Sequence, residues 1–287
     1  MRLSCPDYTW PSLPHAAALD LIRALEFPAV DLGFMAGRSH IRPEAVAADP
    51  AAAGERVRGQ LEQRGLAVAD VFAIPAADFQ SRAVNNPDPA ARAESLEFFG
   101  RAVRFARAAG APGLTTLPGV VFPGEGFDDA LARSADGLRH RVDLAALAGL
   151  ALSVEPHAES LIDTPGKTRQ LLDLVPGLQL TLDHAHYVYG GARQADIDAL
   201  LGWARHLQCR PGRPGQLQVR VVEDAIDFEN VVALLLAQGY EGCLAVEYVW
   251  QDWLDCNRID TVGETALMRD RLRAALSRHA ASRAGQS

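Results

Sequence analysis

Residues 150–186 read LALSVEPHAESLIDTPGKTRQLLDLVPGLQLTLDHAH, and this stretch contains two short runs that both end in a carboxylate and a histidine. The first run, 150–156, includes Glu155, and the second, 178–184, includes Asp183. The residues before each carboxylate are uncharged and mostly apolar, as in a strand that is covered on both faces. A longer mixed segment separates the runs, which is the pattern of a strand, a crossover helix and a parallel strand. The stretch therefore predicts one βαβ unit of a parallel sheet.

The same alternation of apolar runs and helical patterns extends along the whole chain. The eight predicted strands are 2–5, 29–34, 66–74, 113–117, 150–156, 178–184, 206–210 and 243–249. A predicted helix at 88–109 begins with Asp88 and Pro89, which is typical of a helix start. Another at 227–238 is followed by Gly239, a residue suited to a left-handed helix cap. Eight units in 287 residues have about 36 residues each, the size of one βα step.

These features predict an α/β fold with a single domain, the (β/α)8 TIM barrel, over residues 1–279, with a flexible tail at 280–287. The main alternative is an open doubly wound sheet, which usually has a glycine-rich turn after its first strand. Here that turn, residues 6–11, reads PDYTWP and contains no glycine. The barrel is therefore favoured over the open sheet.

The composition indicates a soluble cytoplasmic protein. The sequence is 48% hydrophobic and 22% charged, and no apolar stretch has the length of a signal peptide or a membrane span. The formal net charge of -8 makes the chain a poor partner for nucleic acids, whose phosphates are bound mostly by Lys and Arg. The four cysteines are widely spaced and form no CxxC pair, so we expect buried thiols rather than a zinc or redox site.

Carboxylates stand at the ends of three predicted strands, where a (β/α)8 barrel places its catalytic groups. They are Glu155, Asp183 and Glu247, and the seventh strand contributes Gln208. Burying a carboxylate is costly unless it pairs with a cation, such as an arginine, or binds a metal. We therefore expect these four side chains to hold one divalent metal ion. Oxygen ligands suit Mn²⁺ or Mg²⁺, while Zn²⁺ and Co²⁺ remain open.

Four short motifs give the chain a resemblance to a known superfamily. They are Val154-Glu155-Pro156-His157, Thr164-Pro165, the pair Leu182-Asp183 with His186 three residues later, and Val246-Glu247. With these motifs the sequence resembles the xylose-isomerase-like sugar (phosphate) isomerase/epimerase superfamily, the AP endonuclease family 2 type of TIM barrel. The resemblance covers most of the chain. It implies one divalent metal bound through the glutamates and aspartate of these motifs.

The seventh strand departs from the family pattern. The family usually has His-x-His there, and its second histidine binds the metal, whereas this sequence has His206 and Gln208. An amide oxygen thus takes the place of an imidazole nitrogen, which affects the affinity for the metal and the choice of metal. His206 is the alternative ligand. We expect it to face away from the site, because a shift along a strand moves a side chain to the opposite face.

The resemblance implies an enzyme that isomerises or epimerises a sugar or a related hydroxy-ketone. Glu155 and Glu247 would transfer a proton on opposite faces of one carbon, through an enediolate that the metal stabilises. His186 matches a family position that hydrogen-bonds a substrate oxygen, and Arg210 would reach a substrate hydroxyl or carboxylate. Trp10 and His157 also follow strand ends and are further candidates for binding the carbohydrate-like substrate.

Other functions stay open. A lyase or dehydratase acting on a keto-sugar or keto-polyol would use the same base and metal. A non-catalytic barrel that acts as a binding subunit would be consistent with the change at Gln208. A DNA-repair endonuclease is disfavoured, because such enzymes bind several metals through many histidines and the predicted strands 29–34 and 66–74 contain none. Trp250 and Trp253 follow the last strand and would wall a sugar pocket or face a second subunit in a homodimer.

Overall fold

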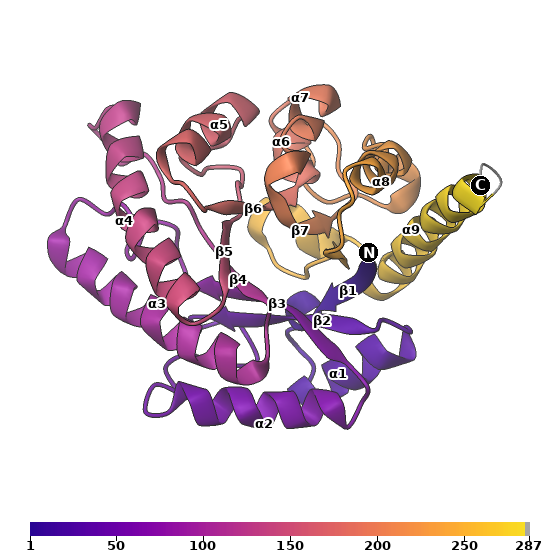
Figure 1. The fold of residues 1–287 in the computed structure, drawn as a ribbon, viewed down its shortest axis with the longest axis horizontal. Coiled ribbons are helices and arrows are strands. Elements are labelled where there is room, and N and C mark those ends of the chain that lie inside the picture. The colour runs from indigo at the N-terminus through magenta and orange to yellow at the C-terminus, as the bar shows by residue number, and fades with distance from the viewer. Residues whose placement is uncertain (285–287) are drawn as a thin grey trace.

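The computed structural model describes residues 1–284 and confirms the predicted barrel. Eight parallel strands close into one sheet in chain order, and the helices lie around it (Figure 1). The strands are β1 (Arg2–Pro6), β2 (Ala29–Met35), β3 (Ala67–Ile74), β4 (Gly113–Thr116), β5 (Ala151–Val154), β6 (Gln179–Asp183), β7 (Ala204–Cys209) and β8 (Cys243–Val246). Each overlaps one of the predicted runs, so the alternation in the sequence identified all eight strands.

Several of the helices begin at a residue whose side chain accepts a hydrogen bond from the first turn. They are α1 (His15–Ala24), α2 (Pro50–Glu62), α3 (Pro89–Ala109), α4 (Phe127–Leu147), α5 (Pro165–Leu174), α6 (His184–Tyr189), α7 (Gln194–Asp198), α8 (Phe228–Ala237) and α9 (Thr261–Ala284). The carboxylate of Asp88 accepts a hydrogen bond from the backbone N–H of Ala90 at the start of α3. Gly239 follows α8 with φ of 71°, the left-handed conformation that glycine adopts without strain. Both predicted helices are confirmed to within a residue.

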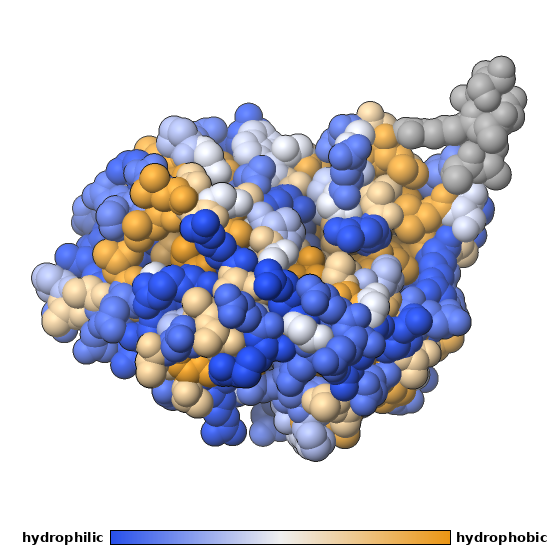
Figure 2. Space-filling view, turned by 60° about the horizontal axis from the view of Figure 1, so that its bottom comes forward, coloured by the Kyte–Doolittle hydropathy of each residue, from blue (hydrophilic) through white to orange (hydrophobic). Residues whose placement is uncertain are grey.

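The end of the chain is more helical than the sequence analysis expected. Helix α9 continues to Ala284, five residues beyond the predicted end of the barrel at residue 279. Residues 285–287, the rest of the predicted tail, lie outside the described residues. Within residues 1–284 no helix combines the length and apolar character needed to cross a membrane. Figure 2 shows one face of the surface, on which hydrophilic residues predominate and apolar ones gather in limited patches.

The core surrounds the barrel strands and contains all four thiols. Cys5, Cys209, Cys243 and Cys256 are buried and free, as predicted. Burial raises the pKa of the Cys5 and Cys209 thiols well above the usual range, so these groups stay protonated and unreactive at neutral pH. The thiols therefore act as small apolar side chains.

Close packing of α2 against α3 depends on Gly54. A Cβ atom at this position would lie 2.5 Å from the carbonyl oxygen of Phe105 and 2.9 Å from the Cβ of Ala108. We expect Gly54→Ala to destabilise the protein by about 1–3 kcal/mol, because the overlap outweighs the better helix propensity of alanine. Gly59 lies in the same helix with nothing within 4 Å of its Cβ position, so Gly59→Ala should stabilise by about 0.5–1 kcal/mol. Urea unfolding of both variants tests the pair; equal effects would contradict the packing argument.

An irregularity in β7 changes which side chains reach the inside of the barrel. Leu180 of β6 pairs with Ala204, but the next residue, Thr181, pairs with His206, so Arg205 is an extra residue in the register. A bulge of this kind lets two successive side chains turn to the same side of a sheet. Arg205 and His206 consequently both contact residues of strands on the other side of the barrel.

Candidate active site

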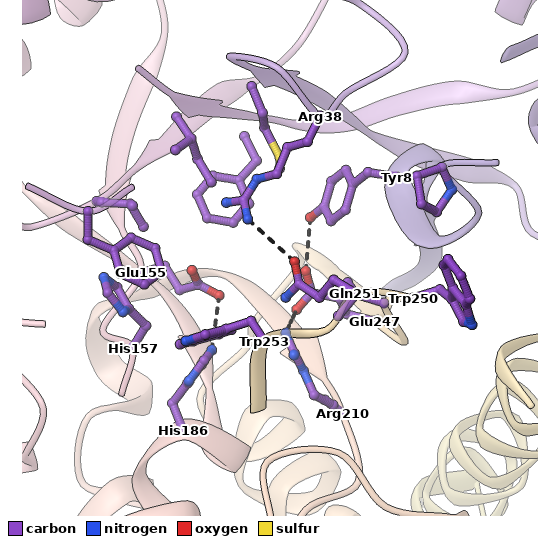
Figure 3. Close-up of a pocket in the computed structure, with 17 residues that line it drawn as sticks. Tyr8, Arg38, Glu155, His157, His186, Arg210, Glu247, Trp250, Gln251 and Trp253 are labelled. Atoms are coloured by element: carbon purple, nitrogen blue, oxygen red, sulfur yellow. Dashed lines mark hydrogen bonds and ion pairs between the residues drawn. The ribbon is translucent and has the colours of Figure 1, made fainter. Parts of the chain in front are cut away.

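A cleft of about 730 Å³ opens where the strands end, and most of the predicted site residues line it (Figure 3). The predicted residues along its wall are Glu155, His157, His186, Arg210, Glu247, Trp250 and Trp253. Tyr8, Arg38 and Gln251 add further polar groups. The rest of the wall is mainly apolar and includes Met35, Phe72, Ile74 and Leu117. The carboxyl ends of strands from all around the barrel thus contribute to one site.

Glu247 is held by three donors. Its Oε1 accepts hydrogen bonds from the Tyr8 hydroxyl and from Gln208 Nε2, both at 3.0 Å. Its Oε2 accepts from Arg210 Nη2. Burial raises the pKa of Glu247, and the Arg210 guanidinium opposes that shift. The carboxylate is therefore fixed in one orientation, with its charge balanced by Arg210.

Arg210 lies between two of the predicted carboxylates. Its side chain is 3% exposed, and its Nε lies 3.1 Å from Asp183 Oδ2, close enough for an ion pair but not aligned as a hydrogen bond. The other Asp183 oxygen, Oδ1, accepts from the backbone N–H of Ala185 at 2.8 Å and caps helix α6. Pairing with an arginine is the alternative to a metal that the sequence predicts for these carboxylates, and Arg210 is that partner for Asp183 and Glu247.

Glu155 is the least satisfied carboxylate of the site. It is 5% exposed, and none of the described residues makes a hydrogen bond to its carboxylate. Its nearest ion-pair partner is His186 Nε2, at 3.7 Å. Burial, together with the neighbouring charge of Asp183, raises the pKa of Glu155 to about 8. A carboxyl group with this pKa is suited to exchange a proton near neutral pH.

The tautomer of His186 follows from its surroundings. The backbone N–H of Ala158 donates to His186 Nδ1 at 3.2 Å, so Nδ1 carries no proton and Nε2 does. Nε2 lies 3.7 Å from both Glu155 Oε1 and Asp183 Oδ2. Burial lowers the pKa of His186 to about 4, so the ring is neutral at pH 7. His186 therefore presents an N–H donor to the cleft, which suits a substrate oxygen better than a metal.

His157 is the opposite tautomer of His186 and carries its ring proton on Nδ1. Its Nδ1 lies 2.5 Å from the carbonyl oxygen of Ala158 and must carry the proton, because a carbonyl only accepts. Burial and the neighbouring His186 lower the pKa of His157 to about 3. Its Nε2 is consequently a buried acceptor without a partner among the described residues. The ring of Phe79, 4.4 Å away between centroids, holds the imidazole in place.

The donor atoms near Glu155 fit a divalent cation. One ligand atom from each of Glu155, Asp183 and His186 lies within 4.8 Å of the others. Asp183 Oδ2 and Gln208 Oε1 are buried acceptors that lack a hydrogen bond within residues 1–284. Because His186 offers an N–H, the oxygen atoms are the better ligands. Glu247 does not belong to this group, and Arg210 is bonded to it instead.

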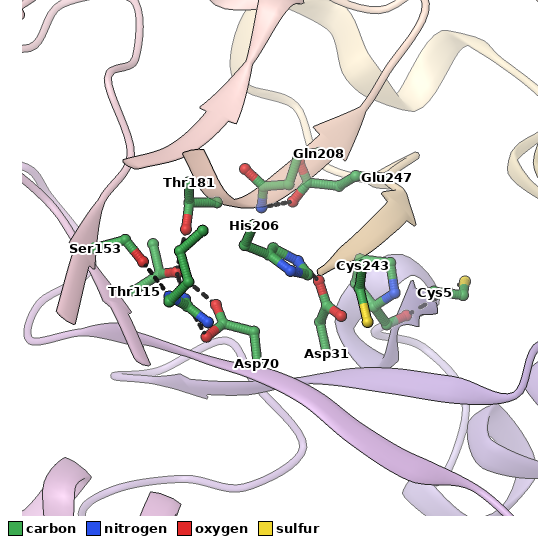
Figure 4. Close-up of polar contacts among 12 residues, drawn as sticks. Cys5, Asp31, Asp70, Thr115, Ser153, Thr181, His206, Gln208, Cys243 and Glu247 are labelled. Atoms are coloured by element: carbon green, nitrogen blue, oxygen red, sulfur yellow. Dashed lines mark hydrogen bonds and ion pairs between the residues drawn. The ribbon is translucent and has the colours of Figure 1, made fainter. Parts of the chain in front are cut away.

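A second polar layer lies inside the barrel (Figure 4). His206 Nε2 lies 2.6 Å from Asp31 Oδ2, and Arg205 Nη2 lies 2.7 Å from Asp70 Oδ1. His206 is therefore paired with Asp31, and the expectation that it faces away from Gln208 on the strand is wrong. It is two residues from Gln208, so both side chains point to the same side of the strand. The sequence alone assigns no function to Asp31 or Asp70.

Of the three tryptophans predicted near the substrate, two line the cleft and one does not. Trp10 is buried in the core and does not line the cleft, whereas Tyr8, two residues earlier in a short 3-10 helix (Asp7–Thr9), does. Trp250 lies at the rim with 49% of its surface exposed. Trp253 donates from Nε1 to Glu159 at 3.2 Å and stands beside His157 and Phe79. Tyr8 and Arg38 were missed, although they lie two and three residues after the ends of β1 and β2.

Comparison with known proteins identifies the family of the chain. A family model, the xylose isomerase-like TIM barrel, matches residues 19–274. The chain belongs to this family. Curated relatives that match it are L-ribulose-5-phosphate 3-epimerase UlaE of Salmonella paratyphi C, 26% identical over 211 residues, and the enzyme of the same name from Salmonella typhi, 25% identical over 212 residues. In both cases the match covers 68% of this chain and 68% of the relative. These relatives are sugar epimerases.

Solved structures of the same shape support the assignment to the xylose isomerase-like fold. An L-ribulose 3-epimerase superposes with a TM-score of 0.76 at 16% identity, covering 98% of this chain and 97% of that chain. A D-psicose 3-epimerase determined in the presence of D-fructose has a TM-score of 0.74 at 14% identity and covers 96% and 99%. The IOLI protein with a bound zinc atom has a TM-score of 0.75 at 14% identity and covers 97% and 99%.

Proposed function

We propose that the protein is a divalent-metal-dependent isomerase or epimerase that moves a proton on the carbon next to the carbonyl of a sugar or related hydroxy-ketone. The observation that carries the proposal is the pair of buried glutamates in one cleft. Glu155 has a raised pKa and no hydrogen bond from the described residues, while Glu247 is fixed by three donors. The likeness to sugar epimerases that cover two thirds of the chain supports the same reaction class.

The side chains of the cleft have distinct tasks in this proposal. Glu155 and Glu247 exchange protons with the substrate from opposite faces of one carbon: whichever of the two is ionised removes the proton, and the other, which starts protonated, returns one. His186 donates its Nε2–H to the substrate oxygen that gains negative charge, and Arg210 adds positive charge nearby. His157 Nε2 accepts a hydrogen bond from a substrate hydroxyl. Phe79 and Trp253 pack against the C–H groups of the substrate.

A divalent ion bound by oxygen atoms of Glu155, Asp183 and Gln208 would polarise the carbonyl and lower the cost of removing the proton. Glu247, the fourth ligand expected from the sequence, would join them only by giving up its contact with Arg210. We keep Mn²⁺ or Mg²⁺ as the proposed metal, because oxygen ligands dominate the site. A cytoplasmic location and a homodimer also remain proposals.

The affinity for the metal is expected to rise about tenfold per pH unit up to pH 8. With a pKa of about 8, the Glu155 carboxyl carries a proton at neutral pH that the metal must displace. Above pH 8 the group is ionised and this dependence ends. Competition for Mn²⁺ with a chelating dye at pH 6, 7, 8 and 9 measures the effect. Glu155→Gln should lose most of the affinity and its pH dependence; a wild-type affinity that does not vary with pH would contradict the prediction.

Exchange of substrate hydrogen with solvent tests the reaction class. The Mn²⁺-loaded protein is incubated in D2O with D-ribulose, D-fructose and L-ribulose 5-phosphate, and NMR follows the carbons beside the carbonyl. Deuterium at that carbon together with a new epimer or isomer supports the proposal. Loss of water would indicate the lyase or dehydratase alternative. Bound sugar without exchange would indicate the non-catalytic binding subunit.

A further inference from the structure

Arg38 is a cation of the cleft that neither the sequence analysis nor the proposed reaction uses. It follows β2 and lines the cleft with Glu155 and Glu247. We infer that the substrate carries an anionic group, a carboxylate or a phosphate, and that Arg38 binds this group. The inference rests on the proposed function, because it names the class of hydroxy-ketone on which the same site acts.

The two arginines of the cleft differ in their partners. Arg210 has Glu247 and Asp183 within ion-pair distance. Arg38 has no carboxylate within 4.0 Å among the residues that the structure describes, and its hydrogen bond goes to the neutral amide oxygen of Gln251 at 3.4 Å. A bond of this length to an amide is weak and readily exchanged for a charged acceptor. Arg38 is therefore the guanidinium that is available to a ligand.

The net charge of the cleft with a divalent ion bound would also favour an anionic substrate. Glu155, Asp183 and Glu247 contribute three negative charges when ionised, and Arg38 and Arg210 contribute two positive ones. A divalent ion would add two more, which leaves an excess of one positive charge among these groups. Arg38 is exposed, so water solvates part of this charge in the free site, and a neutral sugar would displace some of that water and leave the positive charge unbalanced. A substrate with one negative charge balances it.

The position of Arg38 leaves room for the reacting carbon elsewhere in the cleft. Arg38 and Arg210 point into it from opposite sides, with Glu155 and Glu247 between them (Figure 3). The nearby wall is apolar, with Met35 and Ile74 among its residues. Water is displaced from such a wall when a ligand binds, and a charge-assisted hydrogen bond becomes stronger there. An anionic group at Arg38 would thus orient the substrate with its carbonyl toward the glutamates.

Binding measurements on Arg38→Gln test the inference. Isothermal titration of the Mn²⁺-loaded protein compares D-ribulose, D-ribulose 5-phosphate and D-fructuronate at constant ionic strength. We expect wild type to bind at least one anionic ligand more tightly than D-ribulose, and Arg38→Gln to weaken that ligand by about 10- to 100-fold. The affinity for D-ribulose should change little. Arg42→Gln is the matched control, because Arg42 is exposed in the same loop but does not line the cleft.

The ligands whose affinity falls in Arg38→Gln identify the anionic group that Arg38 binds. A loss confined to D-ribulose 5-phosphate identifies a phosphate, and a loss confined to D-fructuronate identifies a carboxylate. The inference is overturned if wild type shows no preference for either anion, or if Arg38→Gln keeps the preference of wild type. Binding is measured without turnover, so it separates the two proposals. An anion preference that depends on Arg38, in a protein that exchanges no substrate hydrogen, would uphold the anion site and refute the isomerase.

Discussion

Glu155→Gln is expected to remove catalytic activity and, at the same time, to stabilise the metal-free protein at alkaline pH. The pKa of this buried carboxyl is raised from 4.5 to about 8. A group with a raised pKa favours the folded state below its unfolded pKa and loses that contribution as pH rises toward the folded value. Above pH 8 the metal-free wild type therefore holds an unpaired buried charge, which glutamine avoids.

The two effects of Glu155→Gln call for separate measurements. Loss of a positioned general base should lower kcat of the metal-loaded enzyme by roughly 100- to 10,000-fold. Without metal, the melting temperature of the variant should exceed that of wild type by at least about 5 °C at pH 9 and by much less at pH 5. Glu55→Gln, on an exposed part of α2, is the control. Equal differences at both pH values would refute the raised pKa.

The sequence predicted those features that depend on local order along the chain. Strand ends are local, so Glu155, Asp183 and Glu247 could be assigned to one rim before any coordinates were known. The cap of α3 is also local, because Asp88 bonds to a backbone N–H two residues away. Position on the chain is enough to place such groups.

Contacts between strands could not be predicted in this way. The bulge at Arg205 changes the direction of side chains in β7, and no single residue type marks it. Trp10 is predicted to bind substrate because it is aromatic and follows the first strand, but a short helical turn follows β1, and Tyr8 lines the cleft where Trp10 does not. The partners of Arg210 depend on how its long side chain crosses from β7 to neighbouring strands. These features follow from packing, which pattern alone does not encode.

Arg210 would compete with a bound metal ion for the same negative charges. The guanidinium is buried against Asp183 and Glu247, so it neutralises charge that a divalent cation would otherwise bind. Its own pKa is raised, because these two carboxylates outweigh the effect of burial. If the proposed site binds a metal, its affinity should therefore depend on both the ligand oxygens and the nearby positive charge of Arg210.

Arg210→Met is expected to destabilise the metal-free protein by about 3–5 kcal/mol, because two buried carboxylates lose their partner. Mn²⁺ should then raise the melting temperature of this variant more than that of wild type, since Glu247 becomes free to bind the ion. Arg141→Met is the matched control: Arg141 is buried and bonded to Ser95 and a backbone carbonyl, with no carboxylate within ion-pair distance among the described residues. It should lose stability without a gain in its response to Mn²⁺. If Mn²⁺ raises the melting temperature of Arg210→Met no more than that of wild type, Arg210 does not keep Glu247 from binding the metal. The charge of Arg210 would then act on the substrate alone.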